Sequence, residues 1–166
     1  MKLRKISPDN FNAIYKILTD TSEWLSMKKI DLWKNPYPEH LFRKDSEDGF
    51  VYVAEYEGIT VGTVTLRDKP SAYYPSVIWH EDDGCSWYLF RLAVSPEFRG
   101  KGFGLKILEQ VEEMAREHKI KRIRLDCDIN LSFLKQYYLS AGYQLVKETV
   151  IKDYQCILME KELACA

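Results

Sequence analysis

The sequence has no long apolar run and no excess of charge of one sign. No stretch approaches the ~18 apolar residues of a membrane-spanning helix. The opening residues, MKLRKISPDNF, become polar too soon for the apolar core of a secretory signal. Lysine and arginine number 24 against 25 acidic residues, which excludes an overall basic field for nucleic acid or an anionic membrane. We therefore expect a cytoplasmic protein with no nucleic-acid partner and no membrane partner.

Cysteine is scarce, and the spacing of the four cysteines matches neither a zinc site nor a disulfide framework. The four cysteines form no C-x-x-C pair and have no histidine nearby in ligand spacing. We therefore expect no zinc site, no other metal and no disulfide framework, but reduced thiols of which some are buried. The cysteines are Cys85, Cys127, Cys156 and Cys165.

Internal repeats and low-complexity segments are also absent, and the size of the chain suits one folding unit. With 166 residues, of which 46% are hydrophobic, the chain has enough apolar side chains for one core. We expect a single domain over residues 1–166.

Local patterns predict strands before, between and after helices. A short strand and a Pro8-Asp9-Asn10 turn precede an amphipathic helix that starts near Phe11 and whose apolar face runs to Leu18; its members are Phe11, Ile14, Tyr15 and Leu18. Between Trp24 and Phe42 the chain is rich in aromatics, and at most one short helix is expected there. The strand, helix and strand within residues 87–126 form a β-α-β unit, so the pattern predicts an α/β fold around a mixed sheet. The other expected elements are a hairpin over 50–66, a long connection over 67–86, a helix over 132–143 and strands over 144–150 and 154–160.

Three of the eight glycines fall in one stretch, RGKGFG, between the strand over 87–94 and the helix that follows it. At such a junction unpaired backbone N–H groups and the helix dipole favour an anion, and glycines let it approach closely. Arg99 and Lys101 add positive charge, which favours a diphosphate. The pattern G-x-x-x-x-G-K-[ST] does not occur, and G-x-G-x-x-G fails at Leu105 and Ile107. A tight turn that serves only packing is the alternative.

The stretch LAVSPEFRGKGFG, followed by a helix, a strand, an asparagine and YYLSAGY, resembles the GNAT N-acetyltransferase superfamily over about residues 50–160. In that family the signature R/Q-x-x-G-x-G/A binds the pyrophosphate of acetyl-CoA, and it falls here on Arg99, Gly102 and Gly104. The resemblance implies acetyl-CoA as co-substrate and a mixed, mostly antiparallel central sheet of about six to seven strands flanked by helices on both faces. It also implies that the main chain of Leu92 to Val94 pairs with the pantetheine arm like an added strand. The residues implied in cofactor binding are Leu92, Ala93, Val94, Arg99, Gly100, Lys101, Gly102, Phe103, Gly104, Leu105 and Asn130.

Acetyl transfer to an amine needs a general base, an oxyanion donor and a general acid. An amine with a pKa near ~10.4 is almost wholly protonated at pH 7, and attack on a thioester creates an oxyanion and a thiolate. The family pattern Y-x-x-x-G-[FY] falls on Tyr138, Gly142 and Tyr143, which implies that Tyr138 protonates the leaving thiolate. The resemblance places the oxyanion donor at the backbone N–H of Leu92. Core packing is the alternative for Tyr138, and helix capping is the alternative for Asn130.

The general base is the least defined of these roles. Family members often carry a carboxylate just before the central strand, and Glu81 is our candidate there. A solvated acidic turn is the alternative for that segment. The further candidates for the base are Asp82, Asp83, Glu55, Asp126 and His80.

Three rival hypotheses stay open beside direct transfer. A covalent acetyl-cysteine route through Cys127 is disfavoured, because no base is adjacent and the family transfers directly in a ternary complex. A non-catalytic acyl-CoA-binding module would be free to lose Tyr138, which is present. A nucleotide-binding domain is disfavoured by the two failed phosphate-loop patterns.

The acceptor is expected to be a small amine, ahead of a peptide or protein N-terminus. Aromatic side chains in the N-terminal region and the long connection are candidates for the walls of a narrow pocket, and the acids at 81–83 would attract a cation. Closure of the core is the alternative role of these aromatics. The sequence leaves open whether the chain forms a homodimer. The aromatic candidates are Trp24, Trp33, Tyr37, Tyr73 and Tyr74.

Overall fold

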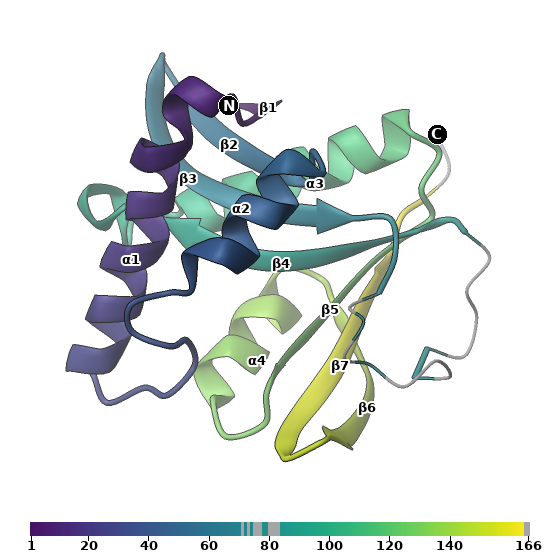
Figure 1. Cartoon of the computed structure of the whole chain (residues 1–166). Helices are drawn as coiled ribbons and strands as arrows, with labels where there is room; N and C mark the ends of the chain where they lie inside the picture. The colour runs from purple at the N-terminus through teal and green to yellow at the C-terminus, as the bar shows by residue number, and fades with distance from the viewer. Residues whose placement is uncertain (71, 73, 75–77, 80–83, 165–166) are drawn as a thin grey trace. The chain divides into compact units, whose positions relative to one another are not determined.

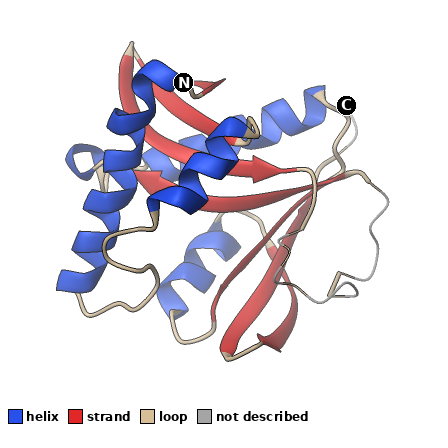
Figure 2. Ribbon diagram, viewed as in Figure 1, coloured by secondary structure: helices blue, strands red, loops and turns tan. Residues whose placement is uncertain are grey.

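The computed structural model describes residues 1–70, 72, 74, 78, 79 and 84–164. Within this part of the chain there are seven strands and four α-helices, labelled in Figure 1 and coloured by type in Figure 2. The strands form one mixed, mostly antiparallel sheet in the order β1-β2-β3-β4-β5-β7-β6. This arrangement confirms the predicted fold class. Residue contacts divide the chain into two compact units: unit 1 is Met1–Leu66 with Phe90–Val111, and unit 2 is Arg67–Leu89 with Glu112–Ala166.

Unit 1 contains the first two strands, all of the third except its last residue, and the second half of the fourth. β1 (Lys2–Lys5) pairs with β2 (Val51–Tyr56), which forms an antiparallel hairpin with β3 (Ile59–Arg67). The hairpin predicted over residues 50–66 is therefore confirmed. β4 (Ser86–Val94) is the strand that both units share.

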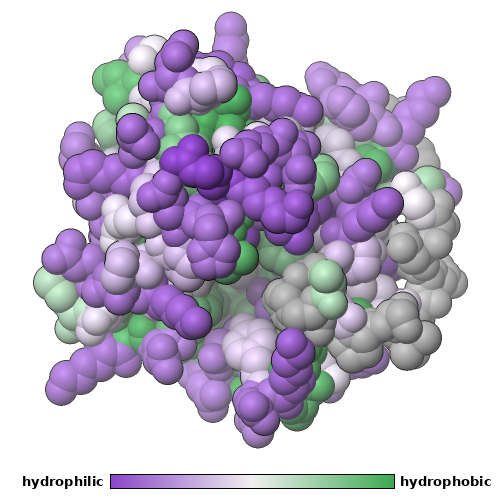
Figure 3. All heavy atoms as spheres, in the orientation of Figure 1, coloured by the Kyte–Doolittle hydropathy of each residue, from purple (hydrophilic) through white to green (hydrophobic). Residues whose placement is uncertain are grey.

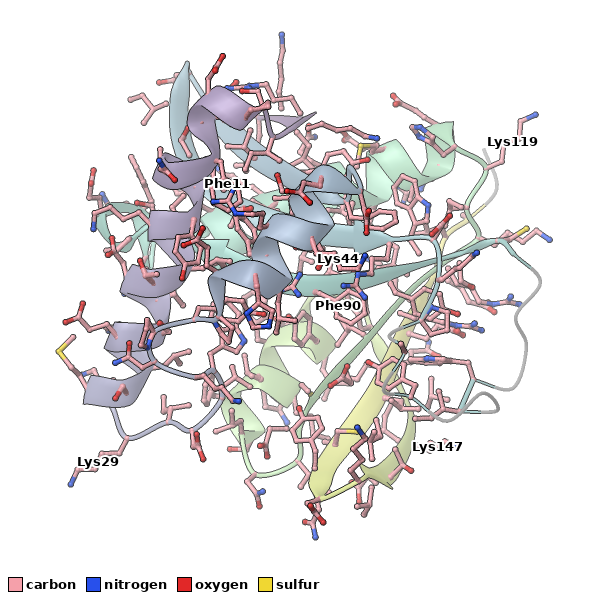
Figure 4. The ribbon with its side chains drawn as sticks, viewed as in Figure 1. Phe11, Lys29, Lys44, Phe90, Lys119 and Lys147 are labelled. Carbon is pink, nitrogen blue, oxygen red and sulfur yellow. The ribbon has the colours of Figure 1, made fainter. Side chains whose placement is uncertain are left out.

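Two helices of unit 1 are amphipathic and pack together. α1 (Phe11–Met27) is longer than the sequence predicts, because its buried stripe continues past Leu18 to Leu25. Phe11, labelled in Figure 4, extends toward α2 (Glu39–Glu47), where its ring centroid lies 5.5 Å from that of Phe42. The helix expected before Phe42 is thus α2, which begins after the prolines and runs past that residue.

The outward side of α2 is hydrophilic, as Figure 3 shows. Glu39 and Arg43 are exposed there and form an ion pair one turn apart. The inner side buries Phe42, as expected, but it also buries the carboxylate of Asp45. A buried acid on an inward helix face requires a partner, which is identified below.

Unit 2 contains the start of β4 and the last three strands. β4 runs parallel to β5 (Arg122–Asp128), with Ser86 opposite Arg122, and α3 (Phe103–Glu117) connects the two strands. This confirms the predicted β-α-β unit. β7 (Tyr154–Glu162) pairs antiparallel with both β5 and β6 (Gln144–Ile151), and α4 (Ser132–Ser140) precedes β6.

Helices of membrane-spanning length and apolarity are not found among the residues that the structure describes.

Candidate functional site

The glycine-rich loop of unit 1 has a backbone that other residues adopt only under strain. After β4 a single 3-10 turn (Pro96–Phe98) leads into the loop, where Gly100 has φ +72° and Gly102 has φ +76°. An L-residue other than glycine in this left-handed region raises the conformational free energy by ~1–2 kcal/mol, whereas glycine adopts it without this cost. A Cβ atom built at either glycine would meet nothing within 4 Å. The glycines therefore set the loop's conformation and leave open space above its backbone.

The backbone N–H groups at the N-terminus of α3 have no acceptors within the helix. The N–H of Lys106 donates to the carbonyl of Gly102, four residues earlier, at 3.2 Å, and this is the first hydrogen bond of the helical i→i−4 type along α3. The N–H groups of Phe103, Gly104 and Leu105 precede that bond. Together with the helix dipole they form a backbone cradle of the type that binds phosphate.

The two cations of the loop have different surroundings. The Arg99 guanidinium lies 4.8 Å from the centroid of the Trp24 ring and donates to the Thr21 hydroxyl at 3.0 Å, so α1 holds it. Burial lowers the pKa of Arg99. Lys101 is exposed, with its Nζ 5.4 Å from the centroid of the Phe98 ring. Lys101 is therefore the more accessible of the two charges, and Trp24 lies against the loop.

Near the end of β4, backbone hydrogen-bonding groups lie on the edge of the strand that faces away from β3. Ser95 donates its N–H to the carbonyl of Val61 in β3 at 2.9 Å. Successive N–H groups of a strand alternate in direction, so those of Leu92 and Val94 point away from β3. The described register between β4 and β5 comprises only Ser86, Trp87 and Tyr88. An extended ligand could therefore hydrogen-bond to this edge of Leu92–Val94.

Tyr138 is the predicted catalytic residue of unit 2, and it lies in a cluster of tyrosines. It is the buried residue of α4, and its ring packs edge-on against Tyr137 and Tyr143, with centroids 5.3 Å and 5.6 Å away. Burial raises the pKa of Tyr138 well above its ordinary value of 10, and the nearby Tyr137 and Cys127 raise it further. The phenol is therefore protonated at neutral pH and can serve as an acid but not as a base.

Tyr143 has a buried hydroxyl that lacks a hydrogen-bond partner among the described residues, and only 2% of the residue is exposed. We predict that Tyr143→Phe raises the free energy of unfolding by about 1 kcal/mol, because it removes a buried polar group that has lost its water. Burial raises the pKa of Tyr143. The unfolded phenol ionises from about pH 10 while the folded one does not, so stability falls as the pH rises above that value. The gain from Tyr143→Phe should thus be larger at about pH 11 than at neutral pH.

Urea denaturation of the two proteins at both pH values measures this difference. If Tyr143→Phe instead lowers the free energy of unfolding by about 1 kcal/mol or more, the hydroxyl has a hydrogen-bond partner and the prediction is wrong.

Asn130, the predicted contact to the cofactor arm, lies in the turn between β5 and α4. Its backbone N–H and its side-chain Nδ2 donate to the same Asp128 oxygen, at 2.8 Å and 3.1 Å. Leu131 is the N-cap residue of α4, so the capping alternative for Asn130 is wrong: its amide is bonded backward, to Asp128. Asn130 is exposed.

The candidates for a general base are distributed over both units. In unit 1 the carboxylate of Glu55 forms an ion pair with Arg4 at 2.5 Å, and the hydrogen bond from Arg4 lowers the pKa of Glu55, which weakens it as a base. In unit 2 Asp126 accepts a hydrogen bond from the Tyr74 hydroxyl. The predicted residues that lie outside the described part of the chain are Glu81, His80, Asp82, Asp83 and Tyr73.

Cys127 is buried in unit 2, with its Sγ 3.9 Å from the Sδ of Met159. Burial raises the pKa of this thiol to about 11, and the neighbouring Asp126 adds to the effect. The thiolate, which is the nucleophilic form, is therefore rare at neutral pH.

Sequence reasoning missed a buried charge cluster in unit 1. Arg91, in the second half of β4, donates from Nη1 to the Asp45 carboxylate and from Nε to the Tyr37 hydroxyl at 2.5 Å. Asp45 thereby acquires the partner that its burial requires. The sequence does contain an indication of this cluster, since Arg91 is the charged residue in the otherwise uncharged stretch WYLFRLAV. Tyr37 also packs edge-on against Trp33, with centroids 5.3 Å apart.

Comparison with known proteins gives consistent results. Residues 11–143 match the model of the acetyltransferase (GNAT) family. A Bacillus subtilis (strain 168) protein, described as the uncharacterized N-acetyltransferase YesJ, is 31% identical over 143 residues, which cover 83% of this chain and 78% of that protein. A crystal structure of a GNAT-family acetyltransferase from Listeria monocytogenes is 26% identical, with a TM-score of 0.81 over 98% of this chain and 94% of the other. The structure of yncA, a putative acetyltransferase from Salmonella typhimurium with its cofactor acetyl-CoA, is 17% identical, with a TM-score of 0.67 over 99% and 94% of the two chains.

Proposed function

This chain belongs to the acetyltransferase (GNAT) family, and we propose that it moves the acetyl group of acetyl-CoA to a primary amine of a small molecule, by direct transfer in a ternary complex. The observation that carries the proposal is the backbone cradle of unit 1. Its open left-handed glycines and the amides at the start of α3 suit a diphosphate that carries two or more negative charges.

The residues of the loop fit the diphosphate of acetyl-CoA through backbone rather than side-chain contacts. The N–H groups from Gly100 to Leu105 would donate to phosphate oxygens, and Lys101 would add an exposed positive charge. Arg99 would act mainly by holding the loop to α1, through Trp24 and Thr21. The edge of Leu92–Val94 would bind the pantetheine arm, with Asn130 as a further contact to it.

Two residues are proposed to meet the charges that develop during transfer. Acetyl-CoA supplies an acetyl group activated as a thioester. The N–H of Leu92 would donate to the carbonyl oxygen as it becomes negative, and the neutral phenol of Tyr138 would give its proton to the leaving sulfur. Glu81 is the proposed base that takes a proton from the acceptor amine.

A small acceptor is favoured by the connection between α1 and α2. The hydroxyl of Tyr15 donates to the backbone carbonyl of Tyr37 at 2.5 Å, and the rings of Trp33 and Tyr37 pack edge-on. Aromatic side chains fixed in this way suit the wall of a narrow pocket better than an open groove for a peptide. The second candidate acceptor is a peptide or protein amine.

Release of free coenzyme A thiol across a panel of amines tests both catalysis and acceptor class. The panel should contain polyamines, amino acids, an aminoglycoside and short peptides with different N-termini, each at the same concentration. We expect thiol release with at least one small amine. Efficient release with peptides and none with small amines would refute the small-molecule acceptor. Tight binding of acetyl-CoA with no release on any amine would favour the non-catalytic module.

A covalent route through Cys127 predicts a different response to mutation. We expect Cys127→Ala to keep turnover within about threefold of wild type, because a thiol with a pKa of about 11 supplies almost no nucleophile at neutral pH. Steady-state thiol release with the best amine of the panel measures the effect. Cys156→Ala is the matched control, since that cysteine is also buried in unit 2. Loss of transfer in Cys127→Ala alone, with acetyl-CoA binding intact, would replace direct transfer by the covalent route.

A further inference from the structure

Arg91 has a left-handed backbone in the middle of a strand. Its φ is +51°, although β4 extends from Ser86 to Val94 on both sides of it. Such a conformation costs an L-residue ~1–2 kcal/mol and persists only where the surroundings impose it. The other non-glycine residues of the described chain with positive φ all lie in turns, and they are Lys29, Glu57, Lys119 and Lys152.

The side chain of Arg91 is held at two of its nitrogen atoms by residues of unit 1. Nη1 donates to the carboxylate of Asp45 and, at 3.3 Å, to the hydroxyl of Thr65, while Nε donates to the hydroxyl of Tyr37 at 2.5 Å. Side-chain exposure is 11% for Arg91 and 1% for Asp45. A charge-assisted network at this burial fixes the guanidinium in one place, and its partners come from β3, α2 and the connection that precedes α2.

The backbone of Arg91 sets the direction of the next N–H group. The peptide plane between Arg91 and Leu92 contains the Leu92 N–H, and it rotates with the backbone dihedrals of Arg91. A return of Arg91 to the extended region would turn that plane relative to the strand, whereas Ser95 would keep its hydrogen bond to Val61 of β3. The Leu92 N–H is the proposed oxyanion donor.

We infer that Arg91 is a positioning residue, whose anchored guanidinium maintains the left-handed backbone that directs the Leu92 N–H at the acetyl carbonyl oxygen. The inference rests on the proposed function, because it needs the acetyl group to lie beside Leu92. It also makes Asp45 and Tyr37 part of the support of the site, although neither touches the reacting atoms.

Two double variants separate the backbone effect from the loss of the ion pair. Arg91→Ala/Asp45→Asn and Arg91→Gly/Asp45→Asn both remove the buried pair without leaving a charged Asp45 alone. They differ in one Cβ atom. Alanine is driven out of the left-handed region, whereas glycine occupies it without steric cost.

The direct readout is the ¹³C signal of acetyl-CoA labelled at the carbonyl carbon, because a donor to the carbonyl oxygen moves that signal downfield. We expect the bound signal to be furthest downfield in wild type, intermediate in the Gly variant and nearest to that of free acetyl-CoA in the Ala variant. The dissociation constant should stay within about threefold in all three proteins, since the cradle is unchanged. Turnover in the Ala variant should fall about fivefold, less than the ~10²-fold or greater loss when an oxyanion donor is removed outright.

Equal carbonyl signals in the Ala and Gly variants, or wild-type signals in both, would overturn the inference. Absence of acetyl-CoA binding in wild type would instead refute the proposed function. Circular dichroism and thermal melting check that both variants fold. If the double variants do not fold, Arg91→Lys serves as the test instead. It keeps the positive charge opposite Asp45 but cannot make the hydrogen bond to Tyr37 in the same geometry. The carbonyl signal of acetyl-CoA bound to Arg91→Lys should therefore lie between those of the wild-type complex and free acetyl-CoA. A wild-type signal in Arg91→Lys would count against the inference.

Discussion

Gly102→Val is expected to raise the dissociation constant of acetyl-CoA by about 100-fold while the protein remains folded. Gly102 has φ +76°, a region that a β-branched residue avoids even more strongly than alanine does. The backbone of the variant should therefore relax, which turns the amides on either side of residue 102 away from the cradle. Each hydrogen bond from an amide to a charged phosphate contributes ~1.5–3 kcal/mol, so the loss of one or two of them gives an effect of this size.

The cost to folding should be small, since a Cβ at Gly102 would meet nothing within 4 Å. Only backbone strain remains, at ~1–2 kcal/mol against a total stability of ~5–15 kcal/mol. Isothermal titration with acetyl-CoA and thermal melting measure the two effects separately.

Gly58→Val is the matched control for this variant. Gly58 lies in the turn between β2 and β3 with φ +80°, and a Cβ there also meets nothing within 4 Å. The two variants should lose similar stability, but only Gly102→Val should lose acetyl-CoA binding. Equal affinities in the two variants would contradict a backbone cradle at this loop.

The elements of the fold were predictable because the patterns that specify them are local. Alternation over residues 50–66 and the helical stripe that starts at Phe11 each need only a few neighbouring residues, and both elements form as predicted. The glycine-rich junction between a strand and a helix was also visible locally, whereas the positive φ of Gly100 and Gly102 emerged only from the structure. The length of α1 was underestimated because the aromatic residues around Trp24 obscure the continuation of its apolar stripe.

Contacts between distant segments were not predictable from the sequence. The contact of the Arg99 guanidinium with the Trp24 ring was not expected, because Trp24 is 75 residues earlier in the chain. The partners of Arg91 are likewise 26 to 54 residues away. No local pattern reports such pairing, and a lone arginine in an apolar strand is compatible with many structures. Once Arg91 is seen to be buried, however, the need for an acid such as Asp45 follows from electrostatics alone.

Tyr138→Phe is expected to lower turnover about 10- to 100-fold and to leave the affinity for acetyl-CoA within about threefold, because a positioned acid contributes ~10²–10⁴-fold and water replaces part of its role. The ring remains, so the edge-on contacts with Tyr137 and Tyr143 are retained. Single-turnover thiol release with the best amine of the panel isolates the chemical step from product release.

Tyr143→Phe is the control, because it removes the hydroxyl of the neighbouring buried tyrosine, whose ring centroid is 5.6 Å away. It should keep wild-type turnover. A general loss of activity from any change in this aromatic cluster would lower both variants equally, whereas loss of the acid lowers only Tyr138→Phe.

The pH dependence provides an independent check on the same assignment. Burial raises the pKa of Tyr138 above its ordinary value of 10, so the phenol keeps its proton throughout the neutral and moderately alkaline range. Deprotonation of this acid therefore should not reduce wild-type turnover until the pH exceeds 10. A wild-type profile that falls near about pH 8, and whose fall persists in Tyr138→Phe, would assign the acid to another group. Equal turnover in Tyr138→Phe and wild type would remove Tyr138 from the mechanism, while membership of the family and the cradle that binds the donor would stand.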